Sequence, residues 1–124
     1  MNRPRFLVLA SSALFLALAG CSTPSVPSTA QVKNLSRPGA ADFVVGEKYE
    51  VVVTGTPDQV VLCAASQNAS PPAKATFGRT GKNGRFSLTG TMQQLHLGLW
   101  TEQWQVGGVK AAPFTFEVKP APAK

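Results

Sequence analysis

The chain has 124 residues, of which 44% are hydrophobic and 15% charged, and its formal net charge is +6. This length is enough for one domain with one modest core. The basic residues are scattered apart from a concentration between Arg79 and Arg85 and do not form a patch interleaved with aromatic residues, so we expect no nucleic-acid partner.

Residues 1–20 have the layout of an export signal. Arg3 and Arg5 form a basic start, and an apolar run from Phe6 to Leu18 follows, interrupted by Ser11 and Ser12. The run is too short to cross a bilayer, which takes about 20 apolar residues, and small residues follow it, as a signal peptidase requires. The sequence therefore predicts that this segment is removed.

The end of this segment, Leu18-Ala19-Gly20-Cys21, resembles the lipobox of bacterial lipoproteins. The resemblance implies that the thiol of Cys21 is diacylated and that cleavage occurs just before it; two acyl chains suffice for stable anchoring. Ser22 in place of Asp after the cysteine implies the outer membrane in a host that has one. The alternative is an ordinary secretory signal in which Cys21 is incidental.

Residues 21–32 are expected to form a flexible tether after the lipidated cysteine. The stretch "STPSVPSTAQ" has neither charge nor apolar periodicity, and Pro24 and Pro27 favour an extended, polyproline-like spacer. The C-terminal "KPAPAK" repeats this composition, and we expect residues 120–124 to be a flexible tail. The folded domain is predicted to span residues 33–119.

Short runs rich in Val, Thr, Phe and Tyr recur between Gly, Pro and Asn, and after the signal no stretch keeps apolar residues at helical spacing. This pattern is typical of an all-β domain. Seven strands are predicted, at residues 43–45, 48–54, 59–65, 73–79, 85–89, 97–106 and 114–119.

Turn residues separate these strands. Pro57-Asp58 is suited to a turn, residues 68–73 form a loop, and Asn83-Gly84 is a strong hairpin signal because both residues tolerate positive φ. Turns at intervals of about 10 to 15 residues favour a single antiparallel Greek-key sandwich.

The segment from Gly84 to Val118 contains "GRFSLTGTM" and "GLWTEQWQVGGVKAAPFTFEV". It resembles the terminal strands of immunoglobulin-like or fibronectin-type-III-like domains in bacterial extracellular proteins. The resemblance implies an immunoglobulin-like sandwich, although the cysteine pair of antibody domains is absent.

Alternation of period two predicts which faces form the core. Tyr49, Val51 and Val53 share one side of their strand, Phe86 and Leu88 share another, and Phe114, Phe116 and Val118 share a third. The polar residues between them are expected to face water.

One strand contradicts this alternation. Trp100, Trp104 and Val106 have core parity, but Glu102 lies between them on the same side. A bulge or an edge position would let Glu102 reach solvent while both Trp side chains stay in the core. In the alternative, Trp104 or Trp100 faces outward and binds a sugar ring together with Glu102 and Gln103.

The remaining reactive side chains predict little chemistry. Cys63 lies in an apolar run and is expected to be a buried, unpaired thiol, and His96, the single histidine, has no partner at metal-ligand spacing. Asp42, Glu47 and Asp58 lack the clustered spacing of a calcium loop, and no nucleophile motif is present. We expect no catalytic residue, no metal and no cofactor other than the acyl chains on Cys21.

The sequence therefore predicts a non-enzymatic lipoprotein of the cell envelope, held at the membrane by its anchor. Its small sandwich is expected to be a structural or protein-interaction module with an envelope or surface protein as partner. The alternative is a carbohydrate-binding module with a glycan as ligand.

Overall fold

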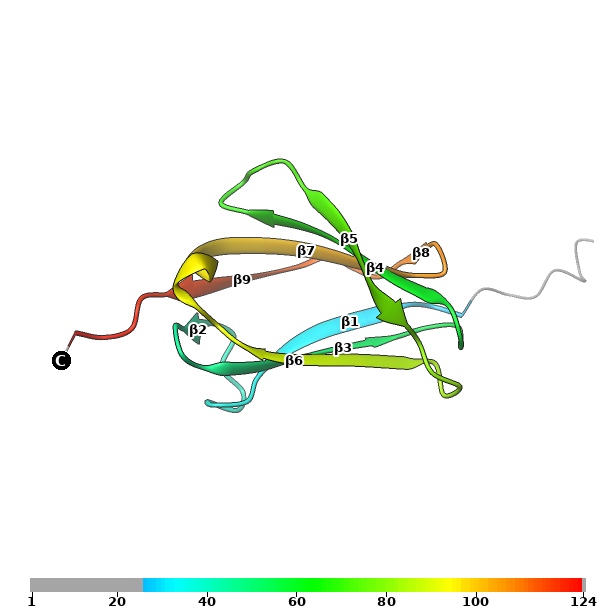
Figure 1. Ribbon diagram of the computed structural model, residues 1–124, viewed down its shortest axis with the longest axis horizontal. Helices are drawn as coiled ribbons and strands as arrows, with labels where there is room; N and C mark the ends of the chain where they lie inside the picture. The colour runs from blue at the N-terminus through cyan, green and yellow to red at the C-terminus, as the bar shows by residue number, and fades with distance from the viewer. Residues whose placement is uncertain (1–25, 124) are drawn as a thin grey trace, which may run out of the picture.

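A computed structural model describes residues 26–123. The predicted signal segment, Cys21 and the first part of the tether lie outside the described residues. Within them, the chain forms two β-sheets packed face to face, with the short 3₁₀ helix η1 (Gln94–His96) before strand β7 (Figure 1).

The smaller sheet has three antiparallel strands, and the larger sheet has six. In the smaller sheet the order is β1 (Thr29–Asn34), β3 (Lys48–Thr54) and β6 (Arg85–Thr91). In the larger sheet it is β2 (Phe43–Val44), β9 (Phe114–Lys119), β7 (Gly98–Val106), β4 (Val60–Gln67) and β5 (Ala73–Arg79), and β8 (Val109–Lys110) pairs with β7.

The all-β architecture is confirmed, and each of the seven predicted strands is present within two residues of its expected bounds. The described residues also contain β1 and β8, which were not predicted. Moreover, β2 pairs with β9 in parallel. The expectation of seven strands in a purely antiparallel arrangement is therefore wrong in these details.

Strand β1 begins inside the segment that was predicted to be a tether. Thr29 to Asn34 pairs along its whole length with β3, from Thr29 opposite Thr54 to Asn34 opposite Tyr49. Ala30 and Val32 pack against the core, whereas Thr29, Gln31 and Lys33 are exposed. The strand was not predicted because this alternation contains only two apolar residues and follows a polar, proline-containing stretch.

The Asn83-Gly84 turn does not close a hairpin. It joins β5 to β6, which belong to different sheets. Only Gly84 of the pair has positive φ, at 75°, and a Cβ there would lie 2.4 Å from the carbonyl oxygen of Gly55. The turn chemistry was identified correctly, but the pairing of the strands depends on packing between the sheets.

The core lies between the sheets and has two parts. One contains Val51, Val53, Val61, Cys63, Trp104 and Val106, and the other contains Phe43, Met92, Phe116 and Val118. The predicted inner residues of β3, β6 and β9 all lie in or against these clusters. Period-two alternation therefore identified the inner faces of three strands correctly.

Candidate functional site

The inner face of β7 carries Trp100, Glu102 and Trp104. The strand keeps one continuous register against β4, in which Glu102 pairs with Ala65 and Trp104 with Cys63, and against β9, in which Trp100 pairs with Phe116. The predicted bulge at Glu102 is therefore wrong. Glu102 keeps core parity and points between the sheets.

The carboxylate of Glu102 is half-buried and has one hydrogen-bond partner among the described residues. The indole Nε1 of Trp104 donates to Oε1 of Glu102 over 3.0 Å, and no hydrogen bond reaches Oε2. Burial raises the pKa of Glu102, and the Trp104 hydrogen bond opposes this shift. Burial, together with the charge of Glu102, also raises the pKa of Tyr49 and raises the pKa of Cys63 to about 12.

Glu102 lines a cavity of about 220 Å³ between the two sheets. Ten further side chains line it: Val32, Tyr49, Val51, Phe77, Leu88, Met92, His96, Trp100, Trp104 and Phe116. Glu102 is the single carboxylate among them, and none is Lys or Arg. We call this space the inter-sheet cavity.

A bulge does exist, but in β5, on the far side of β4 from β7. Val61 pairs with Gly78 and Leu62 with Thr76, so Phe77 is the extra residue. Its ring packs on Trp104 with 4.9 Å between ring centroids, and 44% of Phe77 remains exposed. Phe77 therefore both lines the inter-sheet cavity and is exposed to solvent.

Trp100 and His96 also line the inter-sheet cavity. The indole Nε1 of Trp100 donates to the carbonyl oxygen of His96 over 2.8 Å, and its ring stacks on Phe116 at an interplanar angle of 9°. The Nδ1 atom of His96 accepts a hydrogen bond from the backbone N–H of Gln93. An accepting Nδ1 means that the proton of the neutral ring is on Nε2.

Three of the four predicted ligand residues lie together, and the fourth lies on the other side of the sheet. Trp100, Glu102 and Trp104 line the inter-sheet cavity, whereas Gln103 lies on the outer face of β7, where its amide contacts the carbonyl oxygen of Ala111 at 3.4 Å. Trp104 is only 2% exposed. These residues do not form an exposed platform on which a sugar ring would stack.

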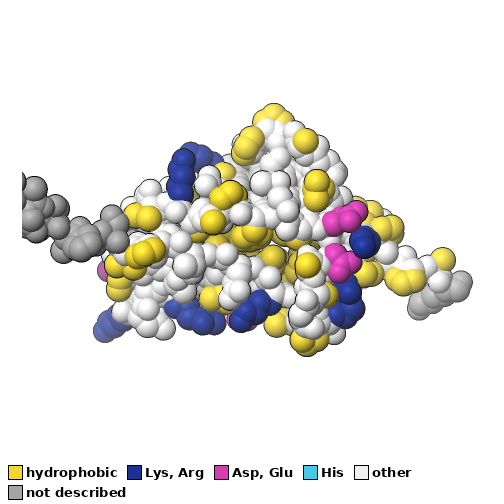
Figure 2. All heavy atoms as spheres, turned by 180° about the vertical axis from the view of Figure 1, so that it is seen from behind, with side chains coloured by type: hydrophobic (Ala, Val, Ile, Leu, Met, Phe, Trp, Pro, Cys, Tyr) yellow, Lys and Arg dark blue, Asp and Glu magenta, His cyan; other side chains and the backbone are white. Residues whose placement is uncertain are grey.

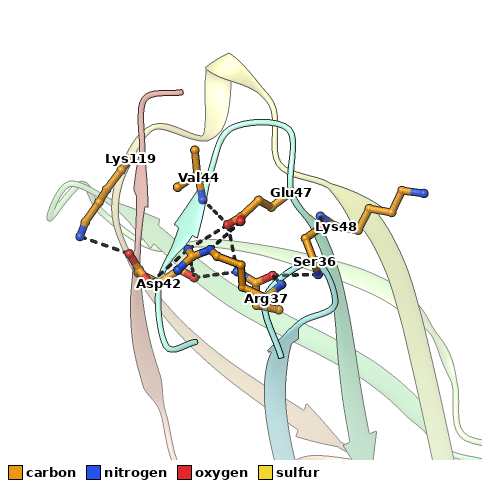
Figure 3. Close-up of polar contacts among 8 residues, drawn as sticks. Ser36, Arg37, Asp42, Val44, Glu47, Lys48 and Lys119 are labelled. Carbon is orange, nitrogen blue, oxygen red and sulfur yellow. Dashed lines mark hydrogen bonds and ion pairs between the residues drawn. The ribbon is translucent and has the colours of Figure 1, made fainter. Parts of the chain in front are cut away.

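A second polar cluster lies in the segment between β1 and β3. Arg37 bridges Glu47, at 2.6 Å from Nε to Oε2, and Asp42, at 3.3 Å (Figure 3). Lys119 also contacts Asp42. On the face seen in Figure 2, acidic and basic side chains gather at the end near the C-terminus.

Asn34, which is 3% exposed, joins this cluster to β1. Its Nδ2 donates to Glu47 Oε1 and to the carbonyl oxygen of Asp42, and its Oδ1 accepts from the backbone of Ser36 and Arg37. The hydrogen bonds from Arg37 hold the pKa of Glu47 at about 2, and Lys119 lowers the pKa of Asp42. Every charge in the cluster has a partner, and these contacts tie the segment between β1 and β3 to Asn34 and to Lys119.

The three acids considered for calcium are not brought together. Asp58 lies at another turn and pairs with Arg79 at 3.4 Å. Among the described residues no group of three or more His, Cys, Asp and Glu side chains is placed to hold a metal ion. Cys63 is a buried free thiol.

No protein-family model matches the chain, and no curated protein matches its sequence. Among solved structures, the chain is similar to the CARDB domain of a Pyrococcus furiosus protein, solved in complex with di-metal ions. The two share 13% identity with a TM-score of 0.41, over 82% of this chain and 99% of that domain. The assignment of a sandwich to this chain rests on the strand pairing and packing described above.

Proposed function

We propose that the chain is a lipoprotein of the cell envelope, anchored through Cys21, whose sandwich is a structural or protein-interaction module. The lipobox-like sequence at Leu18 to Cys21 is the observation that carries the anchor. Strand β1 starts at Thr29, which leaves seven residues, 22–28, between Cys21 and the first strand. From Cys21 to Thr29 there are eight Cα–Cα steps, and at no more than about 3.6 Å per step this link holds the sandwich within about 29 Å of the anchor.

The larger sheet offers the better surface for a partner protein. The outward side chains of β4 and β7 are all uncharged: Val60, Leu62, Ala64, Ser66, Leu99, Thr101, Gln103 and Gln105. Leu99 is 53% exposed and Val60 37%. We call this surface the neutral face.

The neutral face is a central strip of the larger sheet, because its flanking strands carry outward charges at Lys74 and Arg79 of β5, Lys110 of β8 and Glu117 of β9. The smaller sheet carries charges on each of its three strands. Its outward residues include Lys33, Lys48, Glu50 and Arg85. Because charged residues are depleted at the centres of protein interfaces, the neutral face supports protein binding better than the smaller sheet does. Within residues 26–123 no helix is long and apolar enough to span a membrane.

Metabolic labelling with palmitate tests the anchor. We expect the wild-type chain to incorporate label and to fractionate with membranes, and Cys21→Ala to do neither. Cys63→Ala is the matched control, because it removes the other cysteine and should leave labelling unchanged. Label in Cys21→Ala at the wild-type level would overturn the anchor.

Site-specific photo-crosslinking in cells tests the module. A crosslinking residue at Thr101 on the neutral face should yield a discrete adduct that is lost in Leu99→Lys, while one at Ser87 on the smaller sheet should yield none. Thr89→Lys is the matched charge control and should not affect the Thr101 adduct. Equal adducts from Thr101 and Ser87, or an adduct that survives Leu99→Lys, would contradict an interface on the neutral face.

A further inference from the structure

The inter-sheet cavity combines an aromatic lining with one carboxylate that has no cationic neighbour among its lining residues. The rings of Tyr49, Trp100, Trp104 and Phe116 surround the space that Glu102 faces. The ion pairs among the described residues involve Asp42, Glu47 and Asp58, and none of them includes Glu102. A charge in such a position is costly unless a cation approaches it.

The orientation of the carboxylate leaves one oxygen for a ligand. Trp104 Nε1 donates a hydrogen bond to Oε1 of Glu102, and this bond holds the carboxylate against the indole. Oε2 accepts no hydrogen bond in the described part of the chain, and it is not among the fully buried unpaired atoms there. It therefore retains access to the cavity.

We propose that the inter-sheet cavity binds a small organic cation: an ammonium group that pairs with Glu102 Oε2, carried on an apolar body that packs against the aromatic rings. Aromatic faces attract a desolvated cation, and the carboxylate provides a charge-assisted hydrogen bond. The same carboxylate repels anions. The site is independent of the lipid anchor and of the neutral face.

The size of the cavity limits the ligand. A volume of about 220 Å³ corresponds to about seven water molecules at ~30 Å³ each and is below the range of ~300–1,000 Å³ typical for drug-sized ligands. An amine with a single ring or a short branched chain fits this space. A monosaccharide fits less well, because its hydroxyl groups would find polar partners only at Glu102, Tyr49 and His96 among the lining residues.

The test compares two probes that differ in charge, 2-phenylethylamine and 2-phenylethanol. Each is titrated into the full chain in detergent at about pH 8, where the amine is still protonated, and tryptophan fluorescence and calorimetry report binding. We expect the amine to bind the wild-type chain more tightly than the alcohol. In Glu102→Gln the affinity for the amine should fall about tenfold or more, because hydrogen bonds to charged groups contribute ~1.5–3 kcal/mol, and the difference between the two probes should vanish.

Two further variants locate the binding. Glu117→Gln removes an exposed carboxylate from the outer face of β9 and should bind the amine as the wild type does. Leu88→Trp fills the cavity from β6 and should weaken both probes, with circular dichroism confirming that the variant is folded. Amine binding that is unchanged in Glu102→Gln or in folded Leu88→Trp, equal binding of the two probes to the wild type, or no binding of the amine would each overturn the proposal.

Discussion

Glu102 is the residue at which local sequence rules and the fold disagree most. A carboxylate on the inner face of a sheet is unfavourable in its charged form, yet β7 does not bulge to expel it. The strand tolerates it because Trp104 donates a hydrogen bond and the inter-sheet cavity leaves room for solvent or a ligand beside it. The cost of that charge depends on pH.

Glu102→Gln should stabilise the domain at neutral pH. Burial raises the pKa of Glu102 in the folded state, so between its ordinary and its raised value the folded chain binds more protons than the unfolded chain, and the free energy of unfolding falls as pH rises. The glutamine has no such cost and still offers an acceptor to Trp104. Thermal midpoints measured from about pH 4 to about pH 8 should show an advantage for the variant that grows with pH.

The control for this measurement is Glu117→Gln, which neutralises an exposed carboxylate of β9. It should follow the wild type across the same pH range. If the thermal midpoints of the wild type and Glu102→Gln changed in parallel with pH, the result would contradict the burial of the Glu102 charge. Tyr49 and Cys63, whose pKa values are also raised, titrate at higher pH and do not affect this window.

At the scale of elements, β9 fills the core of the larger sheet with alternate residues. Phe116 is 7% exposed, stacks on Trp100 and meets Phe43 edge-on at 5.5 Å between ring centroids. It belongs to the cluster that also covers one side of the inter-sheet cavity. The strand is therefore held by packing between aromatic rings as well as by its pairing with β7.

Phe116→Ala should lower the free energy of unfolding by about 3–5 kcal/mol, the usual cost of deleting a buried aromatic side chain. Since domains of this kind have roughly 5–15 kcal/mol in total, the variant should be severely weakened. Urea denaturation measures the change, and Thr115→Ala on the outer face is the control. A midpoint equal to that of the wild type would mean that Phe116 does not face the core.

The segment between β1 and β3 is held by ion pairs and hydrogen bonds in addition to the burial of Phe43 in the core. Arg37 holds the pKa of Glu47 at about 2, so the stability contributed by Glu47 is present above its ordinary pKa and is lost as pH falls towards 2. Glu47→Gln should therefore be less stable than the wild type at neutral pH, with a difference that shrinks in acid.

Thermal midpoints at about pH 7 and about pH 3 measure this difference. Glu50→Gln, which replaces a carboxylate of β3 that forms no ion pair among the described residues, is the control. A Glu47→Gln deficit that is the same at both pH values would exclude charge pairing as its cause.

At the scale of the whole molecule, the folded domain begins at Thr29, and this position sets how many residues separate the sandwich from the proposed anchor at Cys21. Strand β1 protects one edge of β3 and covers the buried Val51 and Val53 with Ala30 and Val32. Without β1, β3 becomes an exposed edge strand, which favours aggregation. Residues 29–32 therefore belong to the folded domain and not to the predicted tether.

A chain that begins at Val26 should therefore be more stable than one that begins at Lys33, the predicted start of the domain. Denaturation midpoints in urea should be clearly lower for the shorter chain, and size-exclusion chromatography should show that it associates. Equal denaturation midpoints for the two chains would mean that residues 29–32 do not contribute to the folded domain.

The sequence by itself determined the strands with strong alternation. Period two and turn residues located β3, β5 and β9 at their exact bounds and identified Val51, Val53, Phe116 and Val118 as core. The sequence is also the whole basis for the proposed anchor, because the peptidase and the acylating enzyme recognise the signal as a linear sequence. These features depend on residues that are close together in the chain, so a local sequence pattern is enough to predict them.

Only the tertiary structure decided the features that depend on residues far apart in the chain. Asn34 is buried because Asp42 and Glu47 satisfy its amide, the Asn83-Gly84 turn links two sheets because β6 pairs with β3, and the bulge lies in β5, where Phe77 covers Trp104. Period two already placed Glu102 on the inner side of β7, but that the strand keeps it there without a bulge depends on the Trp104 hydrogen bond and on the space of the inter-sheet cavity. No local pattern encodes these outcomes, since each is set by which strands pair and by the space left between the sheets.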